Sequence, residues 1–237
     1  MTTEGKRRQP SESIDRRRLI TSVIWTLLIF SLCLFLPAGT WAWRRGWLFL
    51  VVTLAASFVA TLYLRRVNPD VVAARVNRHD GTRSWDRILL GLLFAAVMAI
   101  PILAALDDGR FHWSQVPWWV CLLGYALFLT GMAGMTWAES VNRFFEPTVR
   151  IQSERGHTVI DTGPYAVVRH PGYVAGSLLF VGIALCLGSL WALVPAGLAS
   201  LVLIVRTRWE DQMLQVELAG YKEYTQRVRF RWIPGLW

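Results

Sequence analysis

The sequence has little charge and little cysteine for its length. Only 17% of its 237 residues are Asp, Glu, Lys or Arg, whereas 54% are hydrophobic and 13 are Trp. A soluble globular domain carries about a quarter charged residues, so these proportions argue against one. Each of the three cysteines (Cys33, Cys121 and Cys186) stands alone in an apolar stretch, where packing as a small hydrophobic side chain is favoured over a disulfide or a metal ligand. We therefore expect no metal site.

Two further features are missing. The net charge of +9 is not accompanied by the alternation of aromatic and basic residues that nucleic-acid-binding proteins show, so no nucleic acid partner is expected. The basic residues 1–18 precede an apolar run that is too long for a signal peptide and lacks a small-x-small cleavage site. We interpret 1–18 as a retained cytoplasmic leader without stable structure.

The apolar residues occur in long uncharged runs. Four of these, at 20–36, 47–64, 88–106 and 117–137, are close to the roughly 20 residues that a helix needs to cross a bilayer. They predict four transmembrane spans within 19–137. The fifth run, 173–205, is too long for one crossing, and Gly188, Ser189 and Pro195 near its middle predict a hairpin of two helices. One tilted span with a re-entrant piece is the alternative. The predicted fold is an all-α, polytopic membrane helix bundle of five or six spans with a cytoplasmic C-terminal helical segment.

The positive charges predict the orientation of these spans. With the N terminus inside, 22 of the 25 Lys and Arg residues fall on the cytoplasmic side, and only Arg44, Arg45 and Arg110 fall outside. Most tryptophans lie near the proposed span boundaries, as interfacial anchors do. We expect an integral, multi-pass membrane protein whose two termini and polar site are cytoplasmic.

Polar side chains gather in two segments, 138–172 and 206–237, so that 138–237 is expected to be the cofactor-binding catalytic region. The first segment ends in Arg-His-Pro-Gly-Tyr, residues 169–173. Pro171 fixes the backbone at a helix start, whose unpaired N–H groups can receive a carboxylate. The alternative is that Arg169 and His170 only contact lipid phosphates.

The second segment begins with charged residues one helical turn apart. Arg206 and Glu210 share one face of a helix that continues the last span, with Asp211 beside them. The alternative interpretation is an ordinary surface salt bridge between Arg206 and Glu210, which contributes less than about 1 kcal/mol.

Both segments resemble the isoprenylcysteine carboxyl methyltransferase family over residues 139–237. The matching positions are Asn142, the run from Gly156 to Tyr173, the R-x-x-x-E-[ED] pattern of Arg206, Glu210 and Asp211, Gly220-Tyr221-x-x-Tyr224, and Arg231-x-x-Pro234. Members of this family are multi-span enzymes that use S-adenosylmethionine. The sequence departs from the family at Asp211, where a second glutamate is more usual.

The resemblance implies roles for individual residues. The positions that hold S-adenosylmethionine correspond to Gln152, His157, Thr158, Val159, Ile160, Tyr165, His170, Pro171, Gly172, Tyr173 and Glu210. Arg206 corresponds to the position that meets the acceptor, so Arg206 and Glu210 are the expected catalytic residues. The cofactor has an adenine, a ribose diol, an ammonium, a carboxylate and a sulfonium, which suit aromatic faces, a carboxylate acceptor and imidazole or backbone donors.

The implied activity is methyl transfer from S-adenosylmethionine to a lipophilic small molecule or lipidated acceptor that enters from the bilayer. A carboxylate, as in isoprenylcysteine O-methylation, is one candidate acceptor. A small-thiol or phospholipid methyltransferase, a membrane NAD(P)H-dependent reductase of the sterol type, and a non-enzymatic scaffold or sensor are the alternatives.

Overall fold

The computed structural model describes residues 16–74 and 81–237 of the chain. The predicted leader therefore lies almost entirely outside the described residues. Within the described ranges the regular elements are all helices and no strand is formed, which confirms the predicted all-α fold.

The first four apolar runs each lie within a helix. They form α1 (Arg16–Ala38), α2 (Arg44–Val67), α4 (Ser84–Ala104), which continues as the π-helical turn η1 (Ala105–Phe111), and α5 (Trp118–Val141). By length and composition, Arg44–Val67, Ser84–Phe111 and Trp118–Val141 are candidate membrane spans, and Leu28–Ala38 is a shorter apolar helix within the described part of α1. The short helix α3 (Pro69–Ala74) follows α2 and was not predicted.

The long apolar run folds as the predicted hairpin. Its helices are α6 (Pro171–Cys186) and α7 (Leu193–Glu217), and Gly188 in the turn between them has a φ of 74°, which only glycine adopts easily. Ser189 closes the turn by accepting the N–H of Ala192 at 3.0 Å. Pro195 lies inside the first turn of α7, where proline is tolerated, and not in the connection. Helix α7 continues without a break past Arg206, as predicted, and α8 (Tyr221–Arg227) follows Gly220.

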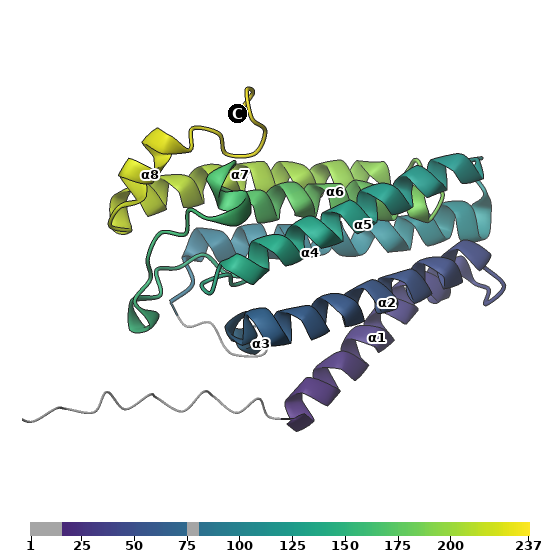
Figure 1. The fold of residues 1–237 in the computed structure, drawn as a ribbon. Helices are drawn as coiled ribbons and strands as arrows, with labels where there is room; N and C mark the ends of the chain where they lie inside the picture. The colour runs from purple at the N-terminus through teal and green to yellow at the C-terminus, as the bar shows by residue number, and fades with distance from the viewer. Residues whose placement is uncertain (1–15, 75–80) are drawn as a thin grey trace, which may run out of the picture.

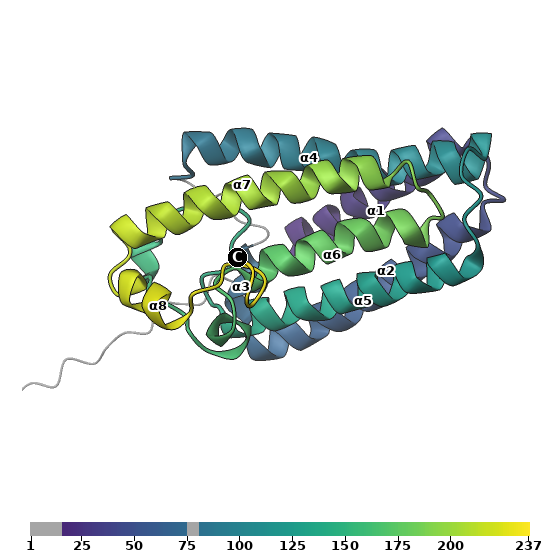
Figure 2. The same ribbon diagram turned by 90° about the horizontal axis from the view of Figure 1, so that it is seen from above.

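The helices pack in layers. Helices α4, α7, α6 and α5 lie side by side in this order in Figure 2, with α1 and α2 on one side of them in Figure 1. The backbones of α5 and α6 touch. A Cβ atom on Gly124 would lie 2.4 Å from the backbone N of Cys186, and one on Gly182 would lie 2.6 Å from the N of Phe128. Small residues at a helix interface allow this approach, which is a common way for membrane helices to associate.

The two ends of the bundle contain different helix ends, turns and buried polar groups. The start of α6, the end of α5, the end of α7 and α8 meet at one end, and the turn between α6 and α7 lies at the other, beside η1 (Figure 1). At that opposite end Asp107 is fully buried and accepts the N–H of Ser114 at 2.6 Å and the hydroxyls of Ser114 at 2.7 Å and Ser189 at 2.5 Å. Its neighbour Asp108 accepts the indole N–H of Trp43 at 2.7 Å and pairs with Arg45.

Candidate active site

The motif at residues 169–173 forms the start of α6. His170 is the N-cap and Pro171 the first helical residue, and the N–H groups of Tyr173 and Val174 both bond to the carbonyl of His170. Gly172 is the second residue of α6, so its N–H has no hydrogen-bond partner within the helix. Gly172 is also closely packed, because a Cβ there would lie 2.8 Å from the far edge of the ring of Phe145, which would have to shift.

A cavity opens beside this helix start. Its walls come from the segment 142–160, the short 3-10 turn Gly163–Ala166, the start of α6, the end of α7 and α8. The empty space, counting the part open to solvent, is about 830 Å³.

The cavity brings together almost all of the residues that the resemblance assigned to the cofactor. Ten of them line it: Gln152, His157, Thr158, Val159, Ile160, Tyr165, His170, Gly172, Tyr173 and Glu210. Pro171 is absent from the wall because it is buried in the helix start behind it. Arg206 does not line the cavity either, and its guanidinium lies against the ring of Tyr173, 5.5 Å from the ring centre.

Two of these residues have side chains that are fixed by the protein itself. The amide of Gln152 donates to the carbonyl of Phe144 at 2.7 Å and accepts from Arg155 at 2.7 Å, so it shapes the wall. Nδ1 of His157 faces the N–H of Gln152 at 3.3 Å. A neutral His157 that accepts at Nδ1 carries its proton on Nε2, which leaves an N–H donor.

Tyr165 and Glu210 both line the cavity. The hydroxyl of Tyr165 accepts from the amide of Asn142 at 3.1 Å, and its carbonyl accepts the hydroxyl of Tyr224 at 2.6 Å. Glu210 on α7 accepts a short hydrogen bond from the hydroxyl of Tyr173 on α6. A carboxylate and two aromatic rings therefore surround the same space.

The predicted alternative of a surface pair between Arg206 and Glu210 is wrong. The side chain of Arg206 is only 5% exposed and makes a bidentate pair with Asp86 of α4, at 2.7 and 3.2 Å. Its NH2 group also donates to the carbonyl of Pro147 at 2.6 Å. Asp86 was missed in the sequence, although an acidic residue two positions before a predicted span is costly to bury and is a signal of such pairing.

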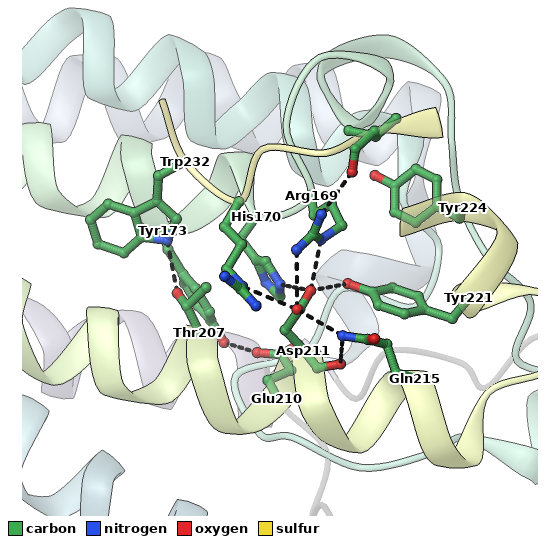
Figure 3. A network of polar contacts seen from close by, with 12 residues as sticks. Arg169, His170, Tyr173, Thr207, Glu210, Asp211, Gln215, Tyr221, Tyr224 and Trp232 are labelled. Atoms are coloured by element: carbon green, nitrogen blue, oxygen red, sulfur yellow. Dashed lines mark hydrogen bonds and ion pairs between the residues drawn. The ribbon is translucent and has the colours of Figure 1, made fainter. Parts of the chain in front are cut away.

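Asp211 is the centre of the polar network shown in Figure 3. Its fully buried carboxylate accepts from Arg169 at 2.8 and 3.1 Å, from the hydroxyl of Tyr221 at 3.1 Å and from Arg231 at 3.1 Å. Nε2 of His170 lies 3.4 Å away. The alternative in which Arg169 only contacts lipid phosphates is wrong, because Arg169 is buried against this carboxylate.

The charges of the site follow from these contacts. Burial alone would raise the pKa of Asp211, but the hydrogen bonds of His170 and Arg169 lower it well below its usual range, so Asp211 is ionised. Burial raises the pKa of Tyr165, which keeps its proton. Burial lowers the pKa of His157, while Glu146 acts in the opposite direction, so the neutral imidazole is favoured.

Known proteins match this part of the chain. Residues 119–219 match the phospholipid methyltransferase family. This is a family of integral membrane methyltransferases related to the isoprenylcysteine carboxyl methyltransferases, which confirms the resemblance predicted from the motifs. The matched segment contains α5, the cavity segment, α6 and α7.

Two curated relatives each match a little over half of the chain. The nickel-cobalt-cadmium resistance protein NccN of Alcaligenes xylosoxydans xylosoxydans is 29% identical over 133 residues, which are 56% of this chain and 59% of that protein. The cobalt-zinc-cadmium resistance protein CzcN of Cupriavidus metallidurans is 30% identical over 130 residues, 54% of this chain and 56% of its own length. The chain thus spans a little over half the length of these relatives. Among the described residues, no group of three His, Cys, Asp or Glu side chains is placed to hold a metal ion.

Proposed function

We propose that this protein transfers a methyl group from S-adenosylmethionine to a lipophilic acceptor at the cytoplasmic membrane surface. The observation that carries the proposal is the convergence of Glu210, two tyrosines and the start of α6 on one cavity in a segment that matches membrane methyltransferases. A cation such as a sulfonium is attracted to aromatic faces and to a carboxylate.

Each polar group of the cofactor has a candidate partner in this wall. Glu210 can accept from the ammonium or the ribose diol, and the N–H of Gly172 at the positive end of α6 can receive the carboxylate. His157 offers a donor from its Nε2. The bound cofactor supplies an already activated methyl group, so the protein has to align the reactants and needs little covalent chemistry.

Arg206 is the residue that we propose for orienting the acceptor. Its Nε and NH2 groups are used by Asp86 and Pro147, and the fork is held rigidly against Tyr173. The NH1 group makes none of these hydrogen bonds and is available for a carboxylate. If the acceptor is a carboxylate, the bound cofactor would supply the methyl group of an ester, and no proton would have to be removed from the acceptor.

The acceptor's tail has a matching surface. An apolar groove between α2 and α5 is lined by residues such as Ala56, Tyr63, Ala133 and Trp137. It ends at Trp137, next to Gly163, two residues before the cavity residue Tyr165. We propose that an acyl or isoprenoid chain lies there, since the small alanines leave room for one.

The identity of the cofactor is tested by measuring the thermal melting of the detergent-purified protein with each candidate ligand. S-adenosylhomocysteine at a hundredfold excess over its dissociation constant should stabilise the protein by about 2.7 kcal/mol. Stabilisation by NADPH without any by S-adenosylhomocysteine would support the sterol-type reductase instead. Incubation with methyl-labelled S-adenosylmethionine and a lipid extract would then identify the acceptor.

The orientation is tested by a matched pair of cysteine variants. Gln115 lies in the loop before α5 and Gln226 in α8, both exposed and at opposite ends of the bundle. In intact cells an impermeant thiol reagent should label Gln115→Cys and spare Gln226→Cys. The reverse pattern would place the cavity on the extracytoplasmic side.

A further inference from the structure

The segment 228–232 lies beyond residues 119–219, which match the phospholipid methyltransferase family, yet it is bonded to the start of α6. The N–H of Arg169 donates to the carbonyl of Phe230 at 3.0 Å, and the N–H of His170 donates to that of Arg231 at 3.0 Å. The guanidinium of Arg169 donates to the carbonyls of Val228 and Arg229, each at 2.8 Å. The backbone that carries His170 is therefore held by the C-terminal segment.

Side chains of the same segment fix it to α7. The indole N–H of Trp232 donates to the hydroxyl of the fully buried Thr207 at 2.8 Å, as Figure 3 shows. Arg231 reaches Asp211 at 3.1 Å with a side chain that is 28% exposed. The segment thus joins α6 and α7 at the cavity.

Asp211 connects this segment to the cavity without lining it. Three of its donors, Arg169, His170 and Tyr221, are cavity residues. The others are Arg231 and Gln215, the latter at 3.1 Å. A carboxylate has about four acceptor sites, so these donors compete for it and their positions depend on one another.

We propose that residues 228–232 are part of the cofactor site, and that Asp211 is its positioning residue. Arg231 and Asp211 hold His170 and Tyr221 in the cavity wall while neither Arg231 nor Asp211 touches the cofactor. When Arg231 is lost, the carboxylate moves towards its remaining donors and His170 moves with it. The inference rests on the proposed use of S-adenosylmethionine.

The test compares two arginines of the C-terminal region. Arg231→Gln removes the contact with buried Asp211, whereas Arg227→Gln removes an exposed pair with Asp161 in which the arginine side chain is 66% exposed. Binding of S-adenosylhomocysteine to the full-length protein is measured by calorimetry in detergent. We expect about tenfold weaker binding for Arg231→Gln, as one charged hydrogen bond implies, and a change below about twofold for Arg227→Gln.

A double-mutant cycle separates positioning from general weakening of the fold. If Arg231 acts through His170, then Arg231→Gln in a His170→Ala background should change the dissociation constant by less than about twofold. Arg231→Lys, which retains the charge, should recover part of the affinity. Equal effects in both backgrounds, or Arg231→Gln binding like the wild type, would overturn this inference alone. If the wild-type protein does not bind S-adenosylhomocysteine, the proposed function is overturned together with this inference.

Discussion

The two ends of the bundle each bury an aspartate completely, but they satisfy it differently. Asp107 receives only neutral donors, from Ser114 and Ser189, and joins η1 to the turn of the helical hairpin. Asp211 receives two arginines and a tyrosine beside a cavity. A buried carboxylate is therefore no sign of a site by itself, and the adjoining cavity and convergent charged groups are what distinguish Asp211.

One well-buried Arg–Asp pair from each end can also be compared, Arg206 with Asp86 at the cavity end and Arg45 with Asp108 at the other. If only the first pair serves catalysis, Arg206→Ala should reduce turnover by at least about a hundredfold, because the acceptor is no longer aligned, with cofactor binding within a few fold. Arg45→Ala should leave turnover per folded molecule nearly unchanged. Methyl transfer from labelled S-adenosylmethionine and calorimetric binding measure both quantities.

A lysine variant tests the role of Arg206 more sharply. Arg206→Lys keeps the positive charge but loses the planar guanidinium that makes two hydrogen bonds to Asp86. We expect this variant to lose most of the turnover as well. Full activity of Arg206→Lys would mean that Arg206 acts only as a diffuse positive charge, and its proposed role would be withdrawn.

The two aspartates are compared with asparagine variants. Asp107→Asn and Asp211→Asn should each lower the free energy of unfolding by about 1 to 3 kcal/mol. The asparagine NH2 group cannot accept the hydrogen bonds that a carboxylate oxygen accepts, so buried donors are left without a partner. Only Asp211→Asn should weaken S-adenosylhomocysteine binding, by about tenfold or more. A similar loss of affinity in Asp107→Asn would show that both ends act on the cavity through the rigid α5 and α6 pair.

The smallest expected effect is a pH dependence from His157. Its pKa lies below the usual 6.5 because burial outweighs the attraction of Glu146. Below about pH 6.5, His157 takes up a proton more readily in the unfolded chain than in the folded protein. The free energy of unfolding therefore decreases as the pH falls. When the pH is lowered from about 7.5 to about 5.5, the melting temperature of His157→Gln should fall less than that of the wild type. Differential scanning fluorimetry measures both melting temperatures. An equal loss would mean that His157 does not contribute.

The sequence predicts the helices better than the side-chain partners. Uncharged runs and Gly188 were enough for the helices and the hairpin, because local composition decides them. The cavity residues in 152–173 and Glu210 were found through the resemblance to the isoprenylcysteine carboxyl methyltransferase family. The partners of Arg206 and Asp211 were not, because Asp86 and Arg231 are far away in the chain and only tertiary packing brings them near.

The close contact of Gly172 with the ring of Phe145 has a consequence for the history of this fold. A methyl group at position 172 would meet that ring at 2.8 Å, so a larger residue there requires the ring of Phe145 to turn aside or position 145 to become smaller. Homologous sequences should therefore tend to carry a smaller residue at position 145 wherever position 172 is larger than glycine. The glycine of the motif would then be retained by its neighbour's ring as well as by the ligand that its N–H can receive.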